Sequence, residues 1–425
     1  MREVSGVDEQ KLSETQTAVP GSKAAGFSDR MTQLALPNKN IGGLVIGGDY
    51  QGLGIIRSLG RHGIPSVVID DEHSIGSYSR YTKHAAHFRS LREPGAVVES
   101  VLSIGKRFGL QGWILFPTRD ETVAAFSNAR EELGQFFRVP TPNWDSVKYA
   151  WDKRNMHQLL KELQIPAPKS FNPGTVEELD HIDFDPPYVL KPAIKEKFFY
   201  KTRAKAWRAN SREELRRLFR LAIDHSGPGE MLIQELIPGD GRYQFSYCAF
   251  FKEGRAIASM VAQRRRQHPL EFGRASTYVV TCENPLLENY GQRFLKAINY
   301  YGLVEAEFKF DPRDEQFKLH DVNLRTWGYH SIGPSAGVDF PYLLFRDQIG
   351  DTVDECRARN GVKWVRTVTD VPASFLGICG GSLKFSEYLQ SLQGPITEAV
   401  FDLKDPLPGI VEIGLLPYLM YKRGF

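Results

Sequence analysis

Cysteine and long apolar runs are both scarce in this sequence. The 425 residues include four cysteines, and none of them stands in a CxxC or CxxH spacing that would indicate a metal or redox motif. Few, scattered cysteines in a chain of this length are typical of a reduced compartment, so we expect a cytoplasmic protein. No apolar run approaches the roughly 20 residues of a membrane-spanning helix, so we expect no membrane partner.

A large excess of one charge is also missing. The chain has 54 basic and 51 acidic residues and a net charge of +3, whereas proteins that bind nucleic acid in bulk usually carry a clear basic excess. We therefore expect no nucleic-acid partner. Residues 1–38 are polar and lack the apolar core of a signal peptide, so we expect a poorly ordered extension there.

The first part of the folded chain has the pattern of a parallel sheet. Residues 43–47 (GLVIG) predict a strand, GGDYQGLG leads into a helical pattern, and residues 65–69 predict a second strand. Such a β-α-β unit predicts parallel pairing. Residues 113–118 (WILFPT) predict a further strand, and ligands of such sheets bind at the carboxyl ends of the strands. Weak candidates near that edge, with turn-forming polar residues as the alternative reading, are Asp49, Gln51, Arg119, Asp120 and Glu121.

The pattern changes near residue 145. A helix capped by Asp152 ends before Pro166, and residues 188–192 (YVLKP) and 231–239 (MLIQELIPG) predict strands on either side of a helix over 210–224. Alternating segments then predict antiparallel strands. A chain of this length exceeds one ordinary core, so we expect two or three domains that mix α/β and α+β architecture.

The most informative segment is VEAEFKFDPRDEQFKLHDVNLR, residues 304–325. It predicts two strands around the turn DPRDEQ. If the hairpin is symmetric about residue 314, Glu307 lies opposite Asp321 and Glu305 lies opposite Asn323, all on one face with Arg325. Three carboxylates and an amide on one face suit a hard cation such as Mg²⁺, which is usually shared with nucleotide phosphates. The alternative is a solvated polar face with salt bridges to Lys309 and Arg325.

This hairpin resembles the metal-binding hairpin of the ATP-grasp superfamily, in which an acidic residue is followed after a turn by E-x-N-x-R. Here the second half reads D-V-N-L-R, residues 321–325, with Asp in place of Glu. Other segments resemble further marks of the superfamily and follow in the right order: WDKRNM, VLKP, IQELIPG and AGVDFP. The resemblance covers residues 43 to about 350, and its motifs are far stronger together than singly. GGDYQGLGIIRSLG and FPTRDETV favour the predicted carboxylate–amine ligases, with D-aspartate ligase among the relatives.

The resemblance implies a fold and a division of the chain. An N-terminal parallel-sheet pre-ATP-grasp domain (39–145) would follow the extension (1–38). A two-lobed ATP-grasp fold with antiparallel sheets would come next, with a small lobe (146–235) and a large lobe with a C-terminal extension (236–425). The oligomeric state is left as monomer or homodimer.

The resemblance also implies an activity and its residues. It implies ligation of a small-molecule carboxylate to an amine through an acyl-phosphate, with ATP and with Mg²⁺, for which Mn²⁺ could substitute. The implied residues are Lys153, Lys191, Gln234, Glu235, Ile237 and Asp240 for the nucleotide, Glu307, Asp321 and Asn323 for the metal, and Arg325 for catalysis. The basic run QRRRQHP (263–269) adds Arg264 or Arg266 as a catalytic candidate that would clamp the carboxylate or the γ-phosphate, with an exposed basic strand end as the alternative.

One segment departs from the family pattern. Many ATP-grasp enzymes cover the phosphates with a glycine-rich loop after the KP strand, but this chain has AIKEKFFYKTRAKAWRA, which contains no glycine. Basic side chains could replace backbone donors there, and the alternative is a solvated basic loop. The basic residues concerned are Lys195, Lys197, Lys201, Arg203 and Lys205, of which Lys205 is the favoured phosphate contact.

Two other functions compete with ligation. A nucleotide-binding regulatory or partner-binding protein would share the fold, but it has little need for the acidic hairpin. A dinucleotide-dependent oxidoreductase is suggested by GGDYQGLG and by Asp70 after the next strand. The glycine spacing fails for that reading, because Asp49 stands where the second fingerprint glycine belongs.

Overall fold

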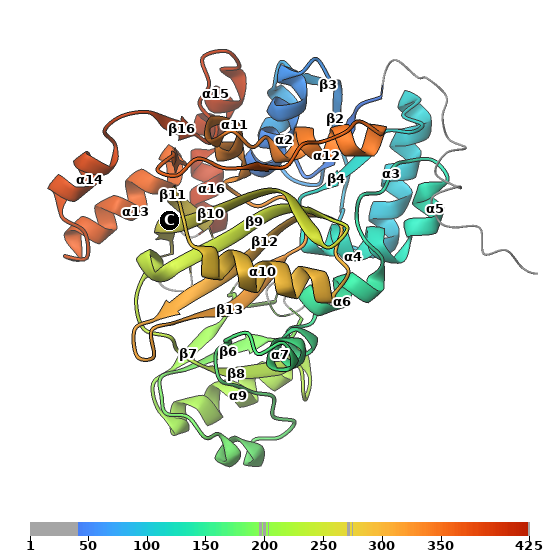
Figure 1. Ribbon diagram of the computed structural model, residues 1–425. Coiled ribbons are helices and arrows are strands. Elements are labelled where there is room, and N and C mark those ends of the chain that lie inside the picture. Colours follow the sequence, from blue (N-terminus) through green and yellow to red (C-terminus); the bar gives the residue numbers. More distant parts are fainter. Residues whose placement is uncertain are drawn as a thin grey trace, which may run out of the picture. The chain divides into compact units, whose positions relative to one another are not determined.

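Three sheets organise the part of the chain that the structure describes. The computed structural model describes residues 41–194, 198, 201–202, 204–269, 273 and 275–423. In these residues the sheets have four, eight and four strands (Figure 1). No helix among them is long and apolar enough to cross a membrane.

The first sheet is parallel throughout, as the sequence predicts, with the order β3-β2-β1-β4. Its central strand β1 is fully buried, which explains the continuous apolar run. Asp49 caps the following helix by accepting from the backbone N–H groups of Gln51 and Gly52. The bounds are β1 Gly43–Ile46, α2 Tyr50–Arg61, β2 Ser66–Asp70, β3 Thr82–His87, α3 Pro94–Phe108, β4 Ile114–Pro117, α4 Asp120–Asn128 and α5 Arg130–Gly134.

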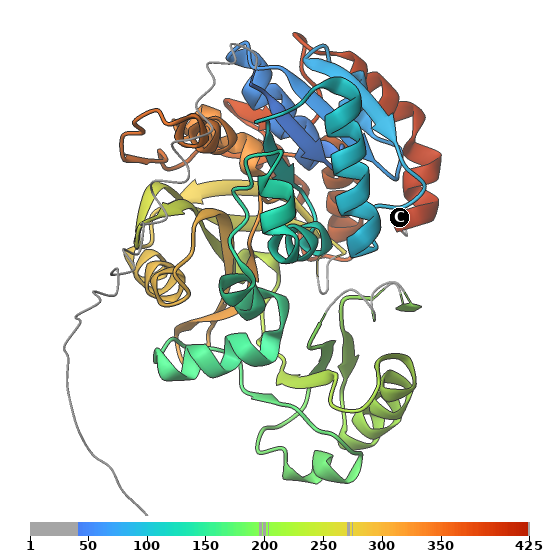
Figure 2. The same cartoon turned by 90° about the vertical axis from the view of Figure 1, so that its right-hand side faces the viewer.

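The small lobe consists of an antiparallel sheet of order β5-β8-β6-β7 and the helix α9, which packs on it through Leu215, Phe219 and Ala222 (Figure 2). Ser211 caps α9 by accepting from the backbone N–H of Glu214, so this helix begins where the sequence predicts. The bounds are α6 Trp144–Trp151, α7 Lys153–Glu162, β5 Ser170–Phe171, β6 Tyr188–Pro192, β7 Trp207–Ala209, α9 Arg212–Ser226 and β8 Met231–Glu235.

The large lobe is built on the eight-stranded sheet, whose main order is β13-β12-β9-β10-β11-β15-β16. Alternate residues of β9 face opposite sides, so Tyr247 packs in the cluster of α10 whereas Cys248 packs in the cluster of α12. The bounds are β9 Gln244–Lys252, β10 Arg255–His268, β11 Ala275–Cys282, α10 Pro285–Ala297, β12 Gly302–Asp311, β13 Gln316–Asn323, α11 Gly333–Ala336 and α12 Phe340–Ile349.

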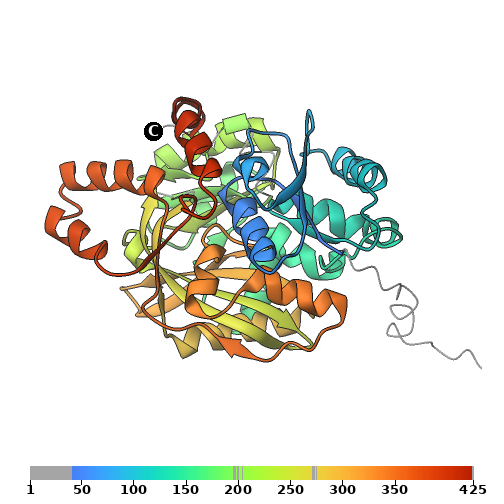
Figure 3. The same ribbon diagram turned by 90° about the horizontal axis from the view of Figure 1, so that it is seen from above.

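The C-terminal segment extends the large sheet and then returns to the N-terminal sheet. Strands β14 and β15 pair with β10 and β11, and β16 pairs with β15. The last helices lie beside the N-terminal sheet (Figure 3), where α15 contacts the 3₁₀ turn Ile75–Tyr78. The bounds are β14 Cys356–Arg357, β15 Lys363–Val365, α13 Thr367–Cys379, α14 Phe385–Ser391, β16 Ile396–Glu398, α15 Leu407–Gly414 and α16 Leu416–Arg423.

Candidate active site

Residues of the small and large lobes line one cleft. The cleft holds about 940 Å³, including solvent at its open mouth, and ligand clefts in proteins hold about 300–1,000 Å³. Among the lining residues without a predicted role, three have polar side chains, namely Gln244, Lys309 and His320. The others include nine of the predicted site residues: Lys153, Lys191, Lys205, Gln234, Glu235, Ile237, Arg264, Glu307 and Asp321.

The acidic end of the hairpin has the pairing that the sequence predicts, whereas the turn end is shifted by one residue from the predicted symmetry about residue 314. Glu307 pairs with Asp321, and Glu305 pairs with Asn323. The side-chain amide of Asn323 donates to Glu305 at 3.0 Å and to Glu307 at 2.9 Å, so these three side chains share one face. Val322 lies on the opposite face, in the core that α10 covers.

A β-bulge interrupts the hairpin next to its acidic pair. Phe308 pairs with Leu319, so His320 is an extra residue on β13. A regular hairpin would turn His320 toward the core, but the bulge places it in the cleft lining. Its Nε2 is buried and has no hydrogen-bond partner within the described residues. Burial lowers the pKa of His320 to about 4, which makes it a neutral side chain at neutral pH.

The two carboxylates of the acidic pair each contact a cation. Lys153 Nζ lies 2.6 Å from Asp321, and Arg264 Nη2 lies 3.0 Å from Glu307. Burial tends to raise the pKa of Asp321, but Lys153 and Lys191 outweigh burial and hold the pKa well below its ordinary value. Burial likewise tends to raise the pKa of Glu307, but the nearby positive charges, Arg264 foremost, together lower it below its ordinary value. Both carboxylates are therefore ionised and available to bind a cation.

Glu305 differs from the acidic pair because it has no cation of its own. Burial raises its pKa, and the neighbouring charge of Glu307 raises it further. Its carboxylate accepts hydrogen bonds from Tyr329 at 2.7 Å and from Ser246 at 3.0 Å. No sequence motif indicates Tyr329 or Ser246, since both come from segments outside the hairpin.

Lysines gather on the other side of the cleft. Burial, together with the charge of Lys153, lowers the pKa of Lys191 to about 7. Lys205 donates to the backbone carbonyl of Gly273 at 3.3 Å and also lines the cleft. Such a cluster of cations around an acidic pair is suited to a polyanionic ligand that is bound together with a metal ion. Lys201 instead donates to the carbonyl of His225 at 2.6 Å, whereas Lys195, Lys197 and Arg203 lie outside the described residues.

The strand β8 brings the predicted adenine-binding residues to the cleft, but two of their side chains bind other protein groups. Gln234 Nε2 contacts His157 Nε2 at 2.6 Å and Ser170 Oγ at 2.7 Å. The carboxylate of Glu235 accepts from the backbone N–H of Lys169 at 2.9 Å, and it also pairs with cations of the hairpin turn. The side chain of Ile237 is buried and apolar. Ile237 therefore offers apolar contact to a base at this position, and the backbone of this segment offers polar groups.

The structure places Arg266 and Asp240 away from the cleft lining of the described residues. Arg266 donates twice to Asp370, at 2.8 Å each. A bulge at Arg265 is the reason, because Arg264 pairs with Val279 whereas Arg266 pairs with the adjacent Tyr278. The two arginines therefore face opposite sides of the sheet, although a regular strand would put them on one side.

The side chains of Asp240 and Arg325 each pair with another charged side chain of the protein. Asp240 accepts from the backbone N–H of Arg242 at 2.8 Å and pairs with its guanidinium. Arg325 donates to the carboxylate of Asp120 at 2.7 Å and to the side-chain amide oxygen Oδ1 of Asn323 at 3.1 Å. Arg325 thus links the acidic hairpin to the start of α4.

The residues predicted at the edge of the N-terminal sheet do not form one site. Gln51 donates to the carbonyl oxygens of Thr118 and Thr326, at 3.0 and 2.6 Å. Arg119 pairs with Asp70 at 2.7 Å and with Asp71 at 2.6 Å. Asp70 also accepts from the backbone N–H of Gly48 at 2.6 Å, so its carboxylate is engaged by the protein and not free for a dinucleotide ribose.

The donor set suits Mg²⁺, although within the described residues no three His, Cys, Asp or Glu side chains cluster as metal ligands. Mg²⁺ in nucleotide sites is commonly bound through one or two carboxylates together with phosphate oxygens. Glu307 and Asp321 supply two opposed, ionised carboxylates, and Asn323 is an amide neighbour. Phosphate oxygens would complete such a site.

The three sheets, their connection and the cleft between the lobes form the ATP-grasp fold, as the resemblance predicted. The structure is similar to the biotin carboxylase domain of 2-oxoglutarate carboxylase from Hydrogenobacter thermophilus, solved as a dimer with MgADP (TM-score 0.60, 17% identity, 76% of this chain and 73% of that chain). It is also similar to the L-amino acid ligase from Bacillus licheniformis (TM-score 0.57, 14% identity, 74% of this chain and 75% of that chain).

One curated relative is a D-aspartate ligase from Enterococcus faecium. It is 23% identical over 249 residues, which are 56% of this chain and 59% of the relative. The chain therefore spans about three-fifths of the length of this relative. No protein-family model matches the chain.

Proposed function

We propose that the protein is an ATP- and Mg²⁺-dependent ligase that joins a carboxylate to an amine and releases ADP and phosphate. The observation that carries this proposal is the meeting of Glu307 and Asp321 with Lys153, Lys191 and Arg264 in one cleft. Ionised acids suit a divalent metal, and the surrounding cations suit a triphosphate. A dinucleotide-dependent oxidoreductase has no need for this combination.

The ion pairs of the cleft suggest how the nucleotide would bind. Lys153 and Arg264 neutralise Asp321 and Glu307 in the unliganded protein. A bound triphosphate would attract these two cations and Lys191, and Mg²⁺ would take their place beside the acids. Bound Mg²⁺ supplies charge neutralisation at the phosphates, which is the main requirement of phosphoryl transfer. Ile237 and the backbone of β8 would contact the base.

The chemistry is a two-step transfer. An oxygen of the substrate carboxylate attacks the γ-phosphorus, and the bond to ADP breaks. The amine then attacks the carbonyl carbon of the acyl-phosphate, loses a proton, and expels phosphate. Arg264 is positioned to stabilise the transferred group, because its Nε is buried and has no hydrogen-bond partner in the described residues. Arg325 lies farther along the same face of the hairpin. Its guanidinium would have to contact the transferred group while it also contacts Asp120.

The comparisons support amino-acid-like substrates. The relatives and neighbours include a D-aspartate ligase and an L-amino acid ligase, and a neighbour of the same fold was solved with MgADP. We therefore propose that at least one substrate of this protein is an amino acid or a close analogue. Small-molecule substrates of this kind need no macromolecular partner.

Incubation of the protein with MgATP and pairs of amino acids tests the proposal. We expect formation of ADP and phosphate that depends on both substrates and on Mg²⁺ or Mn²⁺. Asp314 provides a matched control, because it lies on the same hairpin but outside the cleft lining of the described residues. Nucleotide binding without substrate-dependent turnover would favour a regulatory protein, and failure to bind MgATP would exclude both functions.

A further inference from the structure

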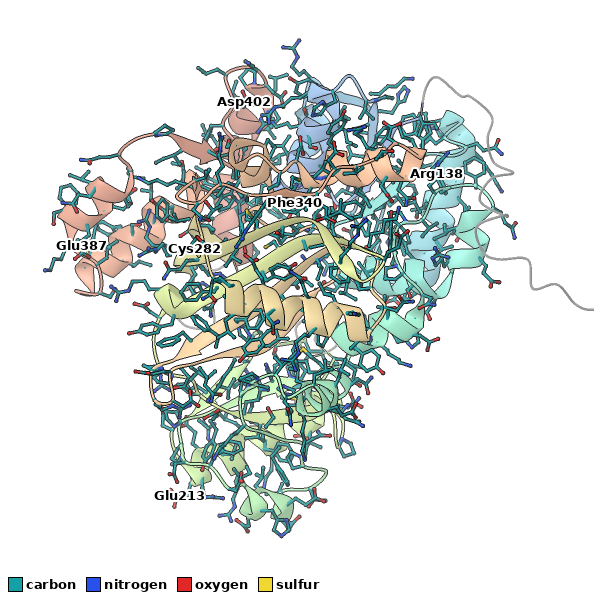
Figure 4. The ribbon with its side chains drawn as sticks, viewed as in Figure 1. Arg138, Glu213, Cys282, Phe340, Glu387 and Asp402 are labelled. Carbon is teal, nitrogen blue, oxygen red and sulfur yellow. The ribbon has the colours of Figure 1, made fainter. Side chains whose placement is uncertain are left out.

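Two helices of the C-terminal segment project from the large lobe. α13 packs on β10 and β11, and α14 follows it after a turn, so that both helices extend to the left in Figures 1 and 3. Glu387 of α14 lies at the left edge of the molecule in Figure 4. We call residues 367–391, which are these two helices and their turn, the α13–α14 hairpin.

Arg266 of β10 fastens this hairpin to the sheet. Its guanidinium donates twice to the carboxylate of Asp370 on α13 and once to Ser391 Oγ on α14, at 2.8 Å each. The guanidinium also lies over the ring of Tyr278, 4.1 Å from its centroid, and over the ring of Tyr388, 5.1 Å from its centroid. The two helices are therefore held in one position by a single side chain, and their outward face is a fixed surface.

The side of α13 that faces its own protein is less apolar than the side that faces outward. Large apolar side chains point outward, with Val371 51%, Phe375 64% and Leu376 52% exposed. An ordinary surface helix has the opposite arrangement, and a helix that is apolar on all sides is normally buried. α13 therefore has the composition of a helix whose outward face is covered. Its own buried residues are small or polar, namely Thr369, Asp370, Ala373, Ser374 and Gly377.

α14 continues the same apolar face. None of its seven residues is buried, and Phe385 and Leu389, one helical turn apart, are 61% and 49% exposed. Helices shorter than about 12–15 residues are only marginally stable in water without tertiary packing. The contact of Arg266 with Ser391 holds one end of α14. A surface that packs on Phe385 and Leu389 would stabilise the rest of the helix.

The outward face has the size of the apolar part of a protein–protein interface. Its five large apolar side chains together expose about 500 Å², a patch as large as those that mark interaction sites on other proteins. A standard interface buries about 800 Å² on each partner, of which about 60% is apolar. The patch therefore supplies most of the apolar area that a stable complex needs.

The charge of the face restricts the kind of partner. Residues 371–393 contain two charged residues, Lys384 and Glu387, and helical spacing puts Glu387 on the opposite side of α14 from Phe385 and Leu389. Nucleic acids and anionic membranes bind surfaces that are rich in lysine and arginine. An uncharged apolar face instead suits a second uncharged apolar face of similar area.

We propose that the outward face of the α13–α14 hairpin is a homodimer interface, in which it packs against the same face of a second copy of this chain. A second copy supplies an apolar surface of equal area and brings no charge that would have to be desolvated. Two-fold symmetry, the commonest symmetry of protein dimers, joins identical faces in this way. Arg266 then acts in assembly, as the residue that positions the interface helices, and not in catalysis.

Sedimentation velocity of the full-length protein over a range of concentrations tests the proposal. We expect the mass of two chains. Phe375→Glu and Phe385→Glu each put a charge into the apolar face at an exposed position, where the fold of the single chain does not depend on the side chain. Each variant should raise the dissociation constant of the dimer about 100-fold or more, because symmetry buries two unpaired charges.

Leu403→Glu is the matched control. Leu403 is 100% exposed in the segment before α15, outside the hairpin, so the variant should keep the mass of the original protein. Circular dichroism checks that every variant is folded. A single-chain mass at all concentrations would overturn the proposal. Dissociation by Leu403→Glu as strong as that by Phe375→Glu would overturn it too, because it would indicate association without a defined interface.

Cross-linking locates the interface without a change in the apolar face. Cys379 is exposed and follows Val371 and Phe375 at four-residue spacing, so its thiol lies on the same stripe of α13. A flexible bis-maleimide should join two chains, and Cys379→Ser should abolish the product. A dimer that is not cross-linked through Cys379 would place the interface elsewhere and contradict the proposal. A monomer that binds phosphatidylcholine vesicles, with binding lost in Phe375→Glu, would assign the face to a membrane instead.

Discussion

The two ends of the hairpin β12–β13 carry similar charged side chains, but these side chains are paired to different extents. At the turn end, Lys318 contacts Asp311 at 2.7 Å and Glu235 at 3.1 Å, and Arg313 pairs with the same two acids. At the cleft end, Asp321 and Glu307 pair with cations from other elements of the fold, Lys153 and Arg264. Within the described residues, buried nitrogens of Arg264 and His320 there have no partner.

The difference separates a structural network from a site prepared for a ligand. Burial tends to raise the pKa of Asp311, but Arg313 and Lys318 reverse that effect and lower it. At the cleft end, burial raises the pKa of Glu305 and lowers that of Lys191. A network in which the charged groups pair with one another contributes to folding. Unpaired donors and shifted pKa values are instead found where a ligand supplies the missing partners.

The largest expected effect comes from breaking the turn-end network with Lys318→Met. Lys318 is 8% exposed, and its loss leaves Asp311 and Glu235 buried with fewer partners. We expect the free energy of unfolding to fall by about 3–5 kcal/mol. Urea unfolding measures this change. Turnover per folded molecule at saturating ATP should be retained, and a large loss of turnover would contradict the division between the two ends.

The next effect is catalytic and belongs to the cleft end. Asp321→Asn keeps the shape of the side chain but removes a charge that would bind the metal. We expect kcat for phosphate release to fall about 100- to 1,000-fold, the range for losing one preorganised electrostatic group. We expect the melting temperature to fall as well, because Asn loses the 2.6 Å ion pair with Lys153, so kcat is measured at a temperature at which the variant is folded. Asp314→Asn is the control on the same hairpin, and equal activity of the two variants would refute the assignment.

A smaller effect is expected from the bulged histidine. His320→Leu removes a buried nitrogen that lines the cleft without a partner in the described residues. If this nitrogen bonds the nucleotide, MgATP binding should weaken about 3- to 10-fold, as for one neutral hydrogen bond. Isothermal titration calorimetry measures the dissociation constant. A tighter complex would mean that His320 is a packing residue only.

The smallest effect concerns proton uptake by Lys191. Its pKa of about 7 in the folded protein lies below the ordinary lysine value of 10.5. Unfolding therefore takes up a proton between these two values, and the contribution of Lys191 to stability increases as the pH rises through that window. Phosphates nearby should raise this pKa, so MgATP binding near pH 8 should take up part of one proton. Calorimetry in buffers of different ionisation enthalpy detects the uptake.

Lys191→Met provides the control for that measurement. The variant lacks the titrating amine, so the dependence of the binding enthalpy on the buffer should fall. Equal buffer dependence in the variant and the original protein would assign the uptake to another group. At a pH well below 7 the uptake should vanish in both proteins, because Lys191 is already charged.

The pairing of the acidic residues could be predicted from sequence, but the register of the whole hairpin could not. Symmetry about residue 314 puts Glu307 opposite Asp321, as in the structure, but Asp311 pairs with Gln316 at the turn, so the acidic pairing also depends on the bulge at His320. The lysines of the cleft could be predicted from the order of the family motifs. These features are set within short segments, and neighbours in the sequence carry the information.

Bulges and distant contacts could not be predicted in this way. The extra residues at His320 and Arg265 are set by pairing with other strands, and each reverses the direction of the side chains that follow. Arg366 and Glu412, which form a buried ion pair, stand in segments without a recognisable motif. Their contact depends on the position of α15 beside the N-terminal sheet, which no local sequence pattern predicts.

The bulge at His320 offsets the alternation of side chains in one half of β13 by one residue relative to the other half. Lys318 and Asp321 lie three positions apart yet oppose Lys309 and Glu307, two residues of the same face of β12. The turn network and the acidic pair can therefore share a surface only while that extra residue is present. Deleting one residue there would turn the side chains of one half of β13 to the opposite face of the sheet. The number of residues at this point therefore constrains the hairpin more than the identity of their side chains does.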